Sequence, residues 1–276
     1  MVTGLGLSGC YSAGVLDPQG PVGAGERLIL LDSLAVMLAI VIPTIIATLG
    51  FAWWYRASNT KARYLPDWSF SGRLELVVWS IPVLVVMFLG GMAWVSSHDL
   101  DPAKPLSGTG KPLEVEVVSL DWKWLFLYPD QGVASVNDLV IPAGQPVHFS
   151  LTSGSVMSAF FVPQLGGMIY TMNGMVTQLN LRADGPGAFA GLASHYSGDG
   201  FSDMRFQARA VPPAAFAAWV QGARAGRPTL DAAAYQGLSR QGLAPVTTYQ
   251  LAGPALFQAI ATQKLPPGPG PASGQP

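Results

Sequence analysis

Two long apolar segments, at residues 28–54 and 74–95, constrain the fold of this chain more than any other feature. A helix that crosses a bilayer needs roughly 20 consecutive apolar residues, and both segments are long enough. The first contains one charge, Asp32, and the second contains only Glu75, at its edge. Two nearly uncharged stretches of this length are rare in soluble cores. We therefore expect a hairpin of two membrane-spanning helices over residues 28–96, rather than two buried core helices.

Charge gives the hairpin an orientation and excludes one class of partner. Only 11% of the residues are charged, whereas soluble domains have roughly 25%. The net charge of −1 offers no electrostatic basis for binding nucleic acid. Basic residues gather in the connecting segment 55–73, which the positive-inside rule places in the cytoplasm. Both termini and the rest of the chain then lie outside, in the periplasm of a Gram-negative bacterium.

The second half of the chain is predicted to form a β-rich domain over residues 110–210. Short strand-like segments separated by Gly/Pro turns are typical of an all-β sandwich or barrel. The composition changes after residue 211, and an alanine-rich extension over 211–264 is expected to be helical. A tail rich in Pro and Gly, 265–276, is expected to be disordered. The expected strands are 113–120, 136–141, 146–152, 157–162, 176–181, 187–191 and 204–210, and the expected helices are 214–224, 230–238 and 254–263.

The chain has few side chains that could bind a metal ion or carry out redox chemistry. The single cysteine, Cys10, excludes an intramolecular disulfide and a copper pair bridged by two thiolates. The only histidines, His98, His148 and His195, are scattered, and we expect them to form no ligand set. We expect this chain to bind no metal or other cofactor. No nucleophile elbow, P-loop or dinucleotide fingerprint is present.

Several motifs that occur in order carry a resemblance to a known family. Asp-Trp-Lys-Trp at 121–124, SVMSAFFVPQLGG at 155–167 and GLASHYSGDGFSDM at 191–204 follow the two apolar segments. Together they resemble subunit II of the haem–copper oxidases. The resemblance implies a membrane-anchored α+β protein: a transmembrane helix hairpin, a cupredoxin-like Greek-key β-sandwich and a short helical C-terminal extension.

The resemblance is closest to the bo-type quinol oxidase branch, because the copper ligands are missing. In the cytochrome c branch, two cysteines, two histidines and a methionine hold a dinuclear copper centre. Only Met204 of that set remains in this chain. The lost ligand positions read Ser158, Ala193, Ser197 and Phe201.

This branch implies a proton-pumping quinol oxidase in the bacterial inner membrane, with haems and copper in subunit I. The partners expected for this chain are subunits I, III and IV and membrane lipids, with quinol at the level of the complex and no cytochrome c. Two other functions stay open: a membrane-anchored periplasmic binding or assembly lipoprotein without oxidase activity, and a true cytochrome c oxidase subunit.

Glu75 is the best candidate for direct participation in activity. Its segment, Arg73 to Trp79, is similar to the family pattern Lys/Arg-x-Glu-x-x-x-Trp, in which the glutamate lies at the mouth of a proton channel. The resemblance therefore implies a role in proton uptake. The alternative is structural, because a glutamate in the first turn of a helix favours the helix dipole by about 0.3–1 kcal/mol.

Two further motifs have more limited implications. Leu-Ser-Gly-Cys, ending at Cys10, resembles a lipobox, so residues 1–27 would carry a lipoprotein signal and an acyl anchor. The alternative for Cys10 is an ordinary buried cysteine. Trp122 and Trp124 lie where copper-bearing members face cytochrome c, and we expect them to serve in packing or subunit contacts. A quinol contact is the less supported alternative.

Overall fold

The computed structural model describes residues 14–63, 65–107, 110–268 and 270. Cys10, and with it the predicted lipid anchor, lies outside the described residues, as does most of the predicted disordered tail. The chain divides into two compact units. Residues 27–101 form a helix hairpin, and the residues before and after them form a globular unit.

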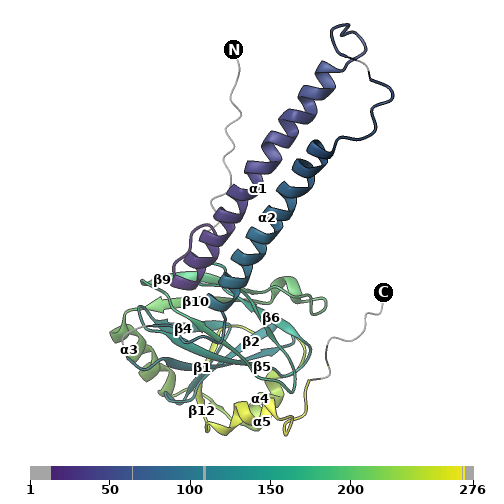
Figure 1. The fold of residues 1–276 in the computed structure, drawn as a ribbon. Helices are drawn as coiled ribbons and strands as arrows, with labels where there is room; N and C mark the ends of the chain where they lie inside the picture. The colour runs from purple at the N-terminus through teal and green to yellow at the C-terminus, as the bar shows by residue number, and fades with distance from the viewer. Residues whose placement is uncertain (1–13, 64, 108–109, 269, 271–276) are drawn as a thin grey trace, which may run out of the picture. The chain divides into compact units, whose positions relative to one another are not determined.

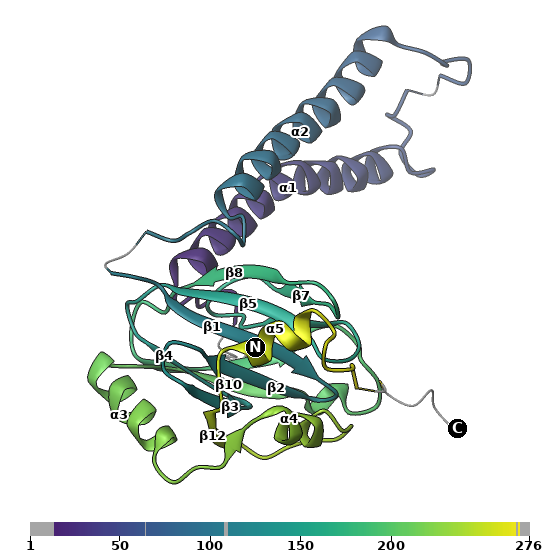
Figure 2. The ribbon, with the colours of Figure 1, turned by 90° about the horizontal axis from the view of Figure 1, so that it is seen from below.

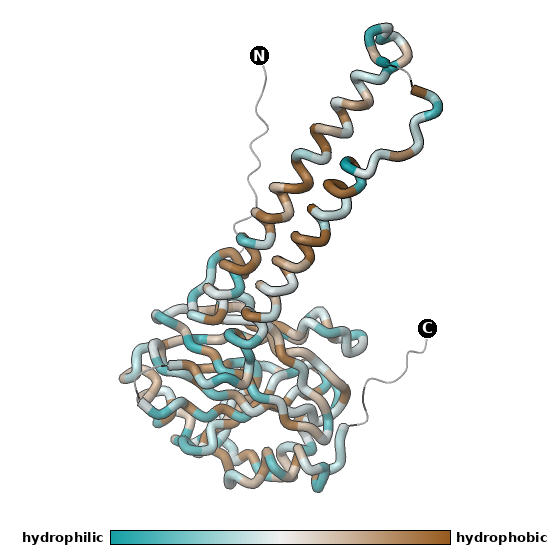
Figure 3. The backbone as a smooth tube through the Cα atoms, viewed as in Figure 1, coloured by the Kyte–Doolittle hydropathy of each residue, from teal (hydrophilic) through white to brown (hydrophobic). Residues whose placement is uncertain are grey.

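The predicted hairpin is confirmed as two long helices, α1 (Pro21–Trp54) and α2 (Gly72–Asp99) (Figure 1). Both are long and apolar enough to cross a membrane by length and composition. Apolar residues run along the length of both helices, and polar residues gather in the connecting loop (Figure 3). α1 begins before the apolar segment, at a proline, because the fixed φ of proline suits the first helical position.

The globular unit is built on two mixed β-sheets, which confirms the predicted sandwich (Figure 2). The larger has seven strands in the order β11-β12-β3-β2-β1-β5-β8, and the smaller has five in the order β4-β10-β9-β6-β7. Their bounds are β1 (Leu113–Leu120), β2 (Lys123–Tyr128), β3 (Val133–Val136), β4 (Asp138–Pro142), β5 (Val147–Ser153), β6 (Ser158–Phe161), β7 (Ile169–Thr171), β8 (Thr177–Leu181), β9 (Gly187–Ala193), β10 (Arg205–Val211), β11 (Thr229–Leu230) and β12 (Thr247–Leu251).

One predicted strand is wrong at its start, and several strands were not expected. The segment 136–141 is divided: Val136 ends β3, and Asn137 turns the chain with a φ of 56° before β4 begins. Asparagine tolerates this left-handed conformation better than most residues. β2 was missed because all six of its residues are buried, so it shows no alternation of apolar and polar side chains.

Aromatic side chains fill the space between the two sheets. Phe160 of β6 stacks on Phe206 of β10, with ring centroids 5.1 Å apart. Trp124 of β2 meets both rings edge-on, at 5.5 and 5.6 Å. Phe126 lies 5.2 Å from Phe206. Edge-to-face and offset arrangements of this kind are the favourable ones for aromatic pairs. The cluster therefore joins the two sheets at their centre.

The C-terminal extension covers the outer face of the larger sheet. It contains the helices α3 (Pro213–Arg224), α4 (Ala232–Leu238) and α5 (Ala255–Ala261). Tyr235, Phe257 and Ile260 pack on Leu125 and other outward side chains of β1 and β2. The expectation of a purely helical extension was incomplete, since β12 pairs antiparallel with β3 and extends the sheet.

The N-terminal residues 14–26 belong to the globular unit and pack closely on it. A side chain at Gly20 would collide with the carbonyl oxygen of Arg182. A Cβ at Gly166 would stand 3.0 Å from the side chain of Val22. Glycine at these two positions therefore permits a backbone approach that a larger residue would prevent.

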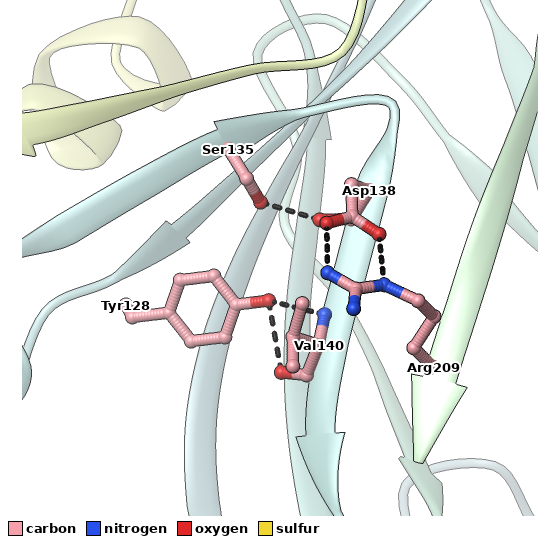
Figure 4. A network of polar contacts seen from close by, with 5 residues as sticks. All are labelled: Tyr128, Ser135, Asp138, Val140 and Arg209. Atoms are coloured by element: carbon pink, nitrogen blue, oxygen red, sulfur yellow. Dashed lines mark hydrogen bonds and ion pairs between the residues drawn. The ribbon is translucent and has the colours of Figure 1, made fainter. Parts of the chain in front are cut away.

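A buried polar network ties strands of both sheets together (Figure 4). Arg209 of β10 donates two hydrogen bonds to the carboxylate of Asp138 in β4, at 2.8 and 2.6 Å. The Tyr128 hydroxyl donates to the carbonyl oxygen of Val140 at 3.0 Å and accepts from its N–H at 2.9 Å. Ser135 Oγ donates to the carbonyl oxygen of Asp138 at 2.5 Å. The network therefore holds β4 against β10 of its own sheet and against β2 and β3 of the other sheet.

We predict that Arg209→Gln lowers the free energy of unfolding by about 2 kcal/mol, because it leaves the buried Asp138 carboxylate without its charged partner. Urea unfolding of the full chain in detergent micelles, followed by tryptophan fluorescence, measures the change. Arg205→Gln is the control, because Arg205 is exposed on the same strand, and surface substitutions change stability by less than about 0.5 kcal/mol. Equal effects of the two substitutions would contradict the prediction.

Candidate functional site

The residues at the lost copper-ligand positions come together at one end of the smaller sheet. Ser158 begins β6, and Ala193 ends β9, which pairs with β6. The N–H of Ala193 donates to the carbonyl oxygen of Met204 at 3.0 Å. Ser158 Oγ lies 3.9 Å from Met204 Sδ. Ser197 and Phe201 lie in the loop between β9 and β10. We call these five residues the loop pole.

The donor set of the loop pole does not fit a copper centre. Such centres use imidazole and thiolate ligands, whereas the loop pole offers two hydroxyls, a methyl group, a phenyl ring and one thioether. Phe201 packs against the hydrophobic core in place of a ligand. Among the residues that the structure describes, no three or more His, Cys, Asp or Glu side chains are placed to hold a metal ion.

Aromatic packing holds the loop in place. Trp122 has a φ of 68°, and its indole N–H donates to the carbonyl oxygen of Ser197 at 3.1 Å. Its ring lies so close to Gly200 that a Cβ there would collide with it. Trp124 is fully buried in the aromatic cluster. Both tryptophans therefore pack within this chain, and the expectation of subunit contacts stays a prediction.

Each histidine has its own local partner. His98 Nδ1 lies 2.8 Å from the carbonyl oxygen of Trp94 within α2. His148 Nδ1 lies 2.7 Å from Glu114 Oε2 on the neighbouring strand. The ring of His195 meets Tyr170 edge-on. These local contacts account for all three imidazoles without a metal ion.

Glu75 lies in the first turn of α2, within the hairpin unit, and its side chain is exposed. Its backbone N–H donates to the carbonyl oxygen of Ser71 at 3.0 Å, so the residue is part of the regular start of the helix. The structure thus gives Glu75 a defined place at the loop end of the hairpin.

Sequence reasoning missed the buried carboxyl group of Asp121 and the half-buried one of Glu116. Asp121 is 2% exposed, and among the described residues neither of its carboxyl oxygens has a hydrogen-bond partner. Lys123 Nζ donates to the carbonyl oxygens of Leu238 and Arg240 at 3.0 and 2.6 Å. Burial lowers the pKa of Lys123, and the nearby Asp121 opposes that effect. The sequence signal was the charged pair beside two tryptophans, but burial depends on the extension that covers it.

Glu116 lies half-buried in β1, and its Oε2 atom has no hydrogen-bond partner in the part of the chain that the structure describes. Burial, with a smaller contribution from the neighbouring Glu114, raises the pKa of Glu116 to about 7. The alternation of the segment 113–118 placed both glutamates on one face. It did not show that this face is partly covered.

We predict that stability depends on pH through Glu116. Its folded-state pKa of about 7 is above the usual value of 4.5. Folding therefore favours the protonated form, and stability falls as pH rises from 4.5 through 7. Glu116→Gln should match the wild type near pH 4.5 and exceed it by about 1 kcal/mol at pH 8, after allowance for solvent screening.

Unfolding curves of the full chain across this pH range measure the difference between Glu116→Gln and the wild type. Asp203→Asn serves as the control, because Asp203 is exposed in the loop between β9 and β10. A difference between Glu116→Gln and the wild type that is constant with pH would show that Glu116 does not titrate in this range.

Comparison with known proteins agrees with the geometry of the loop pole. The family described as cytochrome c oxidase subunit II, periplasmic domain, matches residues 130–211. The ubiquinol oxidase subunit 2 of Acetobacter aceti is 48% identical over 93% of this chain and 84% of that protein. The cytochrome bo(3) ubiquinol oxidase subunit 2 of Pseudomonas aeruginosa is 46% identical over 93% of this chain and 78% of that protein.

Among solved structures, the periplasmic domain of subunit II of a Bradyrhizobium japonicum cytochrome oxidase covers 43% of this chain and 96% of that domain. It does so at 24% identity and a TM-score of 0.40.

The two apolar helices, the cupredoxin-like sandwich and the family match define the class of this protein as an oxidase subunit II. Within that class, the chain belongs to the ubiquinol oxidase subunit 2 family, as its identity to the two curated relatives over nearly its whole length shows. It is a subunit of a quinol oxidase complex, which is an oxidoreductase.

Proposed function

We propose that this chain is a non-redox subunit II of a proton-pumping quinol oxidase in the bacterial inner membrane. Subunit I would hold the haems and copper. Electrons would be transferred from quinol to subunit I without passing through this chain. Its own tasks would be to stabilise subunit I through the helix hairpin, to cap the periplasmic surface and to offer Glu75 for proton uptake. Subunits III and IV would complete the complex.

The loop pole is the observation that carries the non-redox role. Ser158, Ala193 and Met204 still meet at the end of the smaller sheet, yet the group includes neither a thiolate nor an imidazole. A dinuclear copper centre is the means by which the cytochrome c branch accepts electrons. A preserved scaffold with an unsuitable donor set supports electron input elsewhere in the complex, and it supports the absence of cytochrome c as a partner.

We predict that restoring the donors restores copper binding. A variant with Ser158→His, Ala193→Cys, Ser197→Cys and Phe201→His keeps Met204 and completes the ligand set that the family resemblance implies. Elemental analysis of the full chain after exposure to copper should find about two ions per variant chain and none above background in the wild type.

Copper bound tightly by the wild type would refute the non-redox role. A folded variant that takes up no copper would show that the scaffold has changed beyond the loss of its ligands. Ser158→Ala with Phe201→Leu controls for altered packing at the same pole.

Glu75 is proposed as a proton donor at the bilayer edge. The exposed carboxyl group in the first turn of α2 can exchange protons with water. The basic connecting loop places this end in the cytoplasm by the positive-inside rule, so the termini and the sandwich would be periplasmic. Protons for oxygen reduction and pumping would then enter from the cytoplasmic side.

We predict that Glu75→Ala lowers quinol oxidase turnover about tenfold or more, because proton transfer loses its positioned carboxylate. The haem content of the purified complex should stay normal, and Glu75→Asp should restore most of the activity. Asp67→Asn is the matched control, since it removes an exposed carboxylate from the connecting loop. Wild-type turnover in Glu75→Ala would leave Glu75 with the structural role alone.

A further inference from the structure

The hairpin unit contains a cavity of about 540 Å³ at its loop end. Its walls come from three consecutive parts of the chain: the end of α1, the connecting loop and the first turn of α2. The whole lining belongs to residues 27–101, so the cavity lies within one unit. The lining residues are Phe51, Tyr55, Arg63, Leu65, Trp68 and Leu74.

The lining combines a mostly apolar wall with one cation. Trp68 and Leu65 are 59% and 51% exposed, so the loop presents large apolar side chains beside the cavity. Tryptophan and tyrosine concentrate where a membrane meets water, because one part of each side chain is apolar and the other is polar. This composition suits a ligand with a long apolar part and a negatively charged head.

Arg63 is the cation of the cavity lining, and it is exposed. Another arginine at this end, Arg56, is engaged: its guanidinium lies 4.7 Å from the Trp53 ring centroid and donates to the carbonyl oxygen of Trp53 at 2.8 Å. Within the described part of the chain, the side chain of Arg63 forms no hydrogen bond or ion pair, and no carboxylate lines the cavity. An arginine next to an apolar wall is well suited to bind a phosphate.

We propose that this cavity binds an anionic phospholipid, with an acyl chain along the aromatic wall and the phosphate beside Arg63. The connecting segment carries four basic residues, Arg56, Lys61, Arg63 and Arg73, against one acidic residue, Asp67. This excess of positive charge attracts anionic headgroups. A neutral quinol would leave Arg63 without a counter-charge, and a zwitterionic lipid would bring a second cation close to its phosphate.

Binding to the full chain in detergent micelles tests the site with phosphatidylglycerol as the probe. The wild type should bind phosphatidylglycerol about fivefold more tightly than phosphatidylcholine of the same acyl composition, and Arg63→Gln should lose about that factor. Lys61→Gln removes the same charge from the same loop but lies outside the lining. It should change the affinity by less than about twofold.

Phosphatidylglycerol with brominated acyl chains locates the bound lipid. It should quench tryptophan fluorescence in the wild type, and Trp68→Phe should remove the largest part of that quenching while circular dichroism stays unchanged. If Arg63→Gln and Lys61→Gln lost the same affinity for phosphatidylglycerol, the preference would come from the overall positive charge of the loop, and the proposed site would be overturned. Equal affinity for the two lipids, displacement by a short-chain quinol, or quenching that persists in Trp68→Phe would also overturn it.

Discussion

Aromatic packing between the two β-sheets is the interaction on which the rest of the globular unit depends. Phe160 and Phe206 stack across β6 and β10, and Trp124 closes the cluster from the opposite sheet. Phe160 also pairs in register with Ala193, so the same packing that joins the sheets sets the position of the loop pole. A pole held in this way needs no metal ion to keep its shape, which accounts for a retained scaffold without retained ligands.

The loop between β9 and β10 shows how such a scaffold survives. Gly200 leaves room for the ring of Trp122, whose indole N–H holds the carbonyl of Ser197. Phe201 turns into the core, where burial of an aromatic ring stabilises the loop. Hydrophobic packing thus takes over the cohesion that metal–ligand bonds provide in copper-bearing relatives. The loop can therefore keep its position without metal ligands.

The C-terminal extension changes the electrostatics of the larger sheet. Its helices α4 and α5 pack on the outer faces of β1 and β2, so these strands are covered on both sides. Asp121 and Lys123 become buried as a result, and Glu116 is partly covered. Burial lowers the pKa of Lys123 and raises the pKa of Glu116 to about 7, because it penalises the charged form of each group. This part of the molecule therefore responds to pH, whereas the loop pole carries no such group.

The sequence by itself determined the helix hairpin, the β-sandwich and the missing copper donors, because these depend on apolar length, on alternation and on residue identity at matched positions. It did not reveal β2, whose two-sided burial removes alternation, or β12, whose strand character comes from pairing with β3. Only the tertiary structure decided that Ser158 and Met204 meet, that Glu116 is half-buried and that Arg63 faces an aromatic cavity. The first two results depend on contacts between residues distant in sequence, and the third depends on how the connecting loop folds; local patterns encode neither.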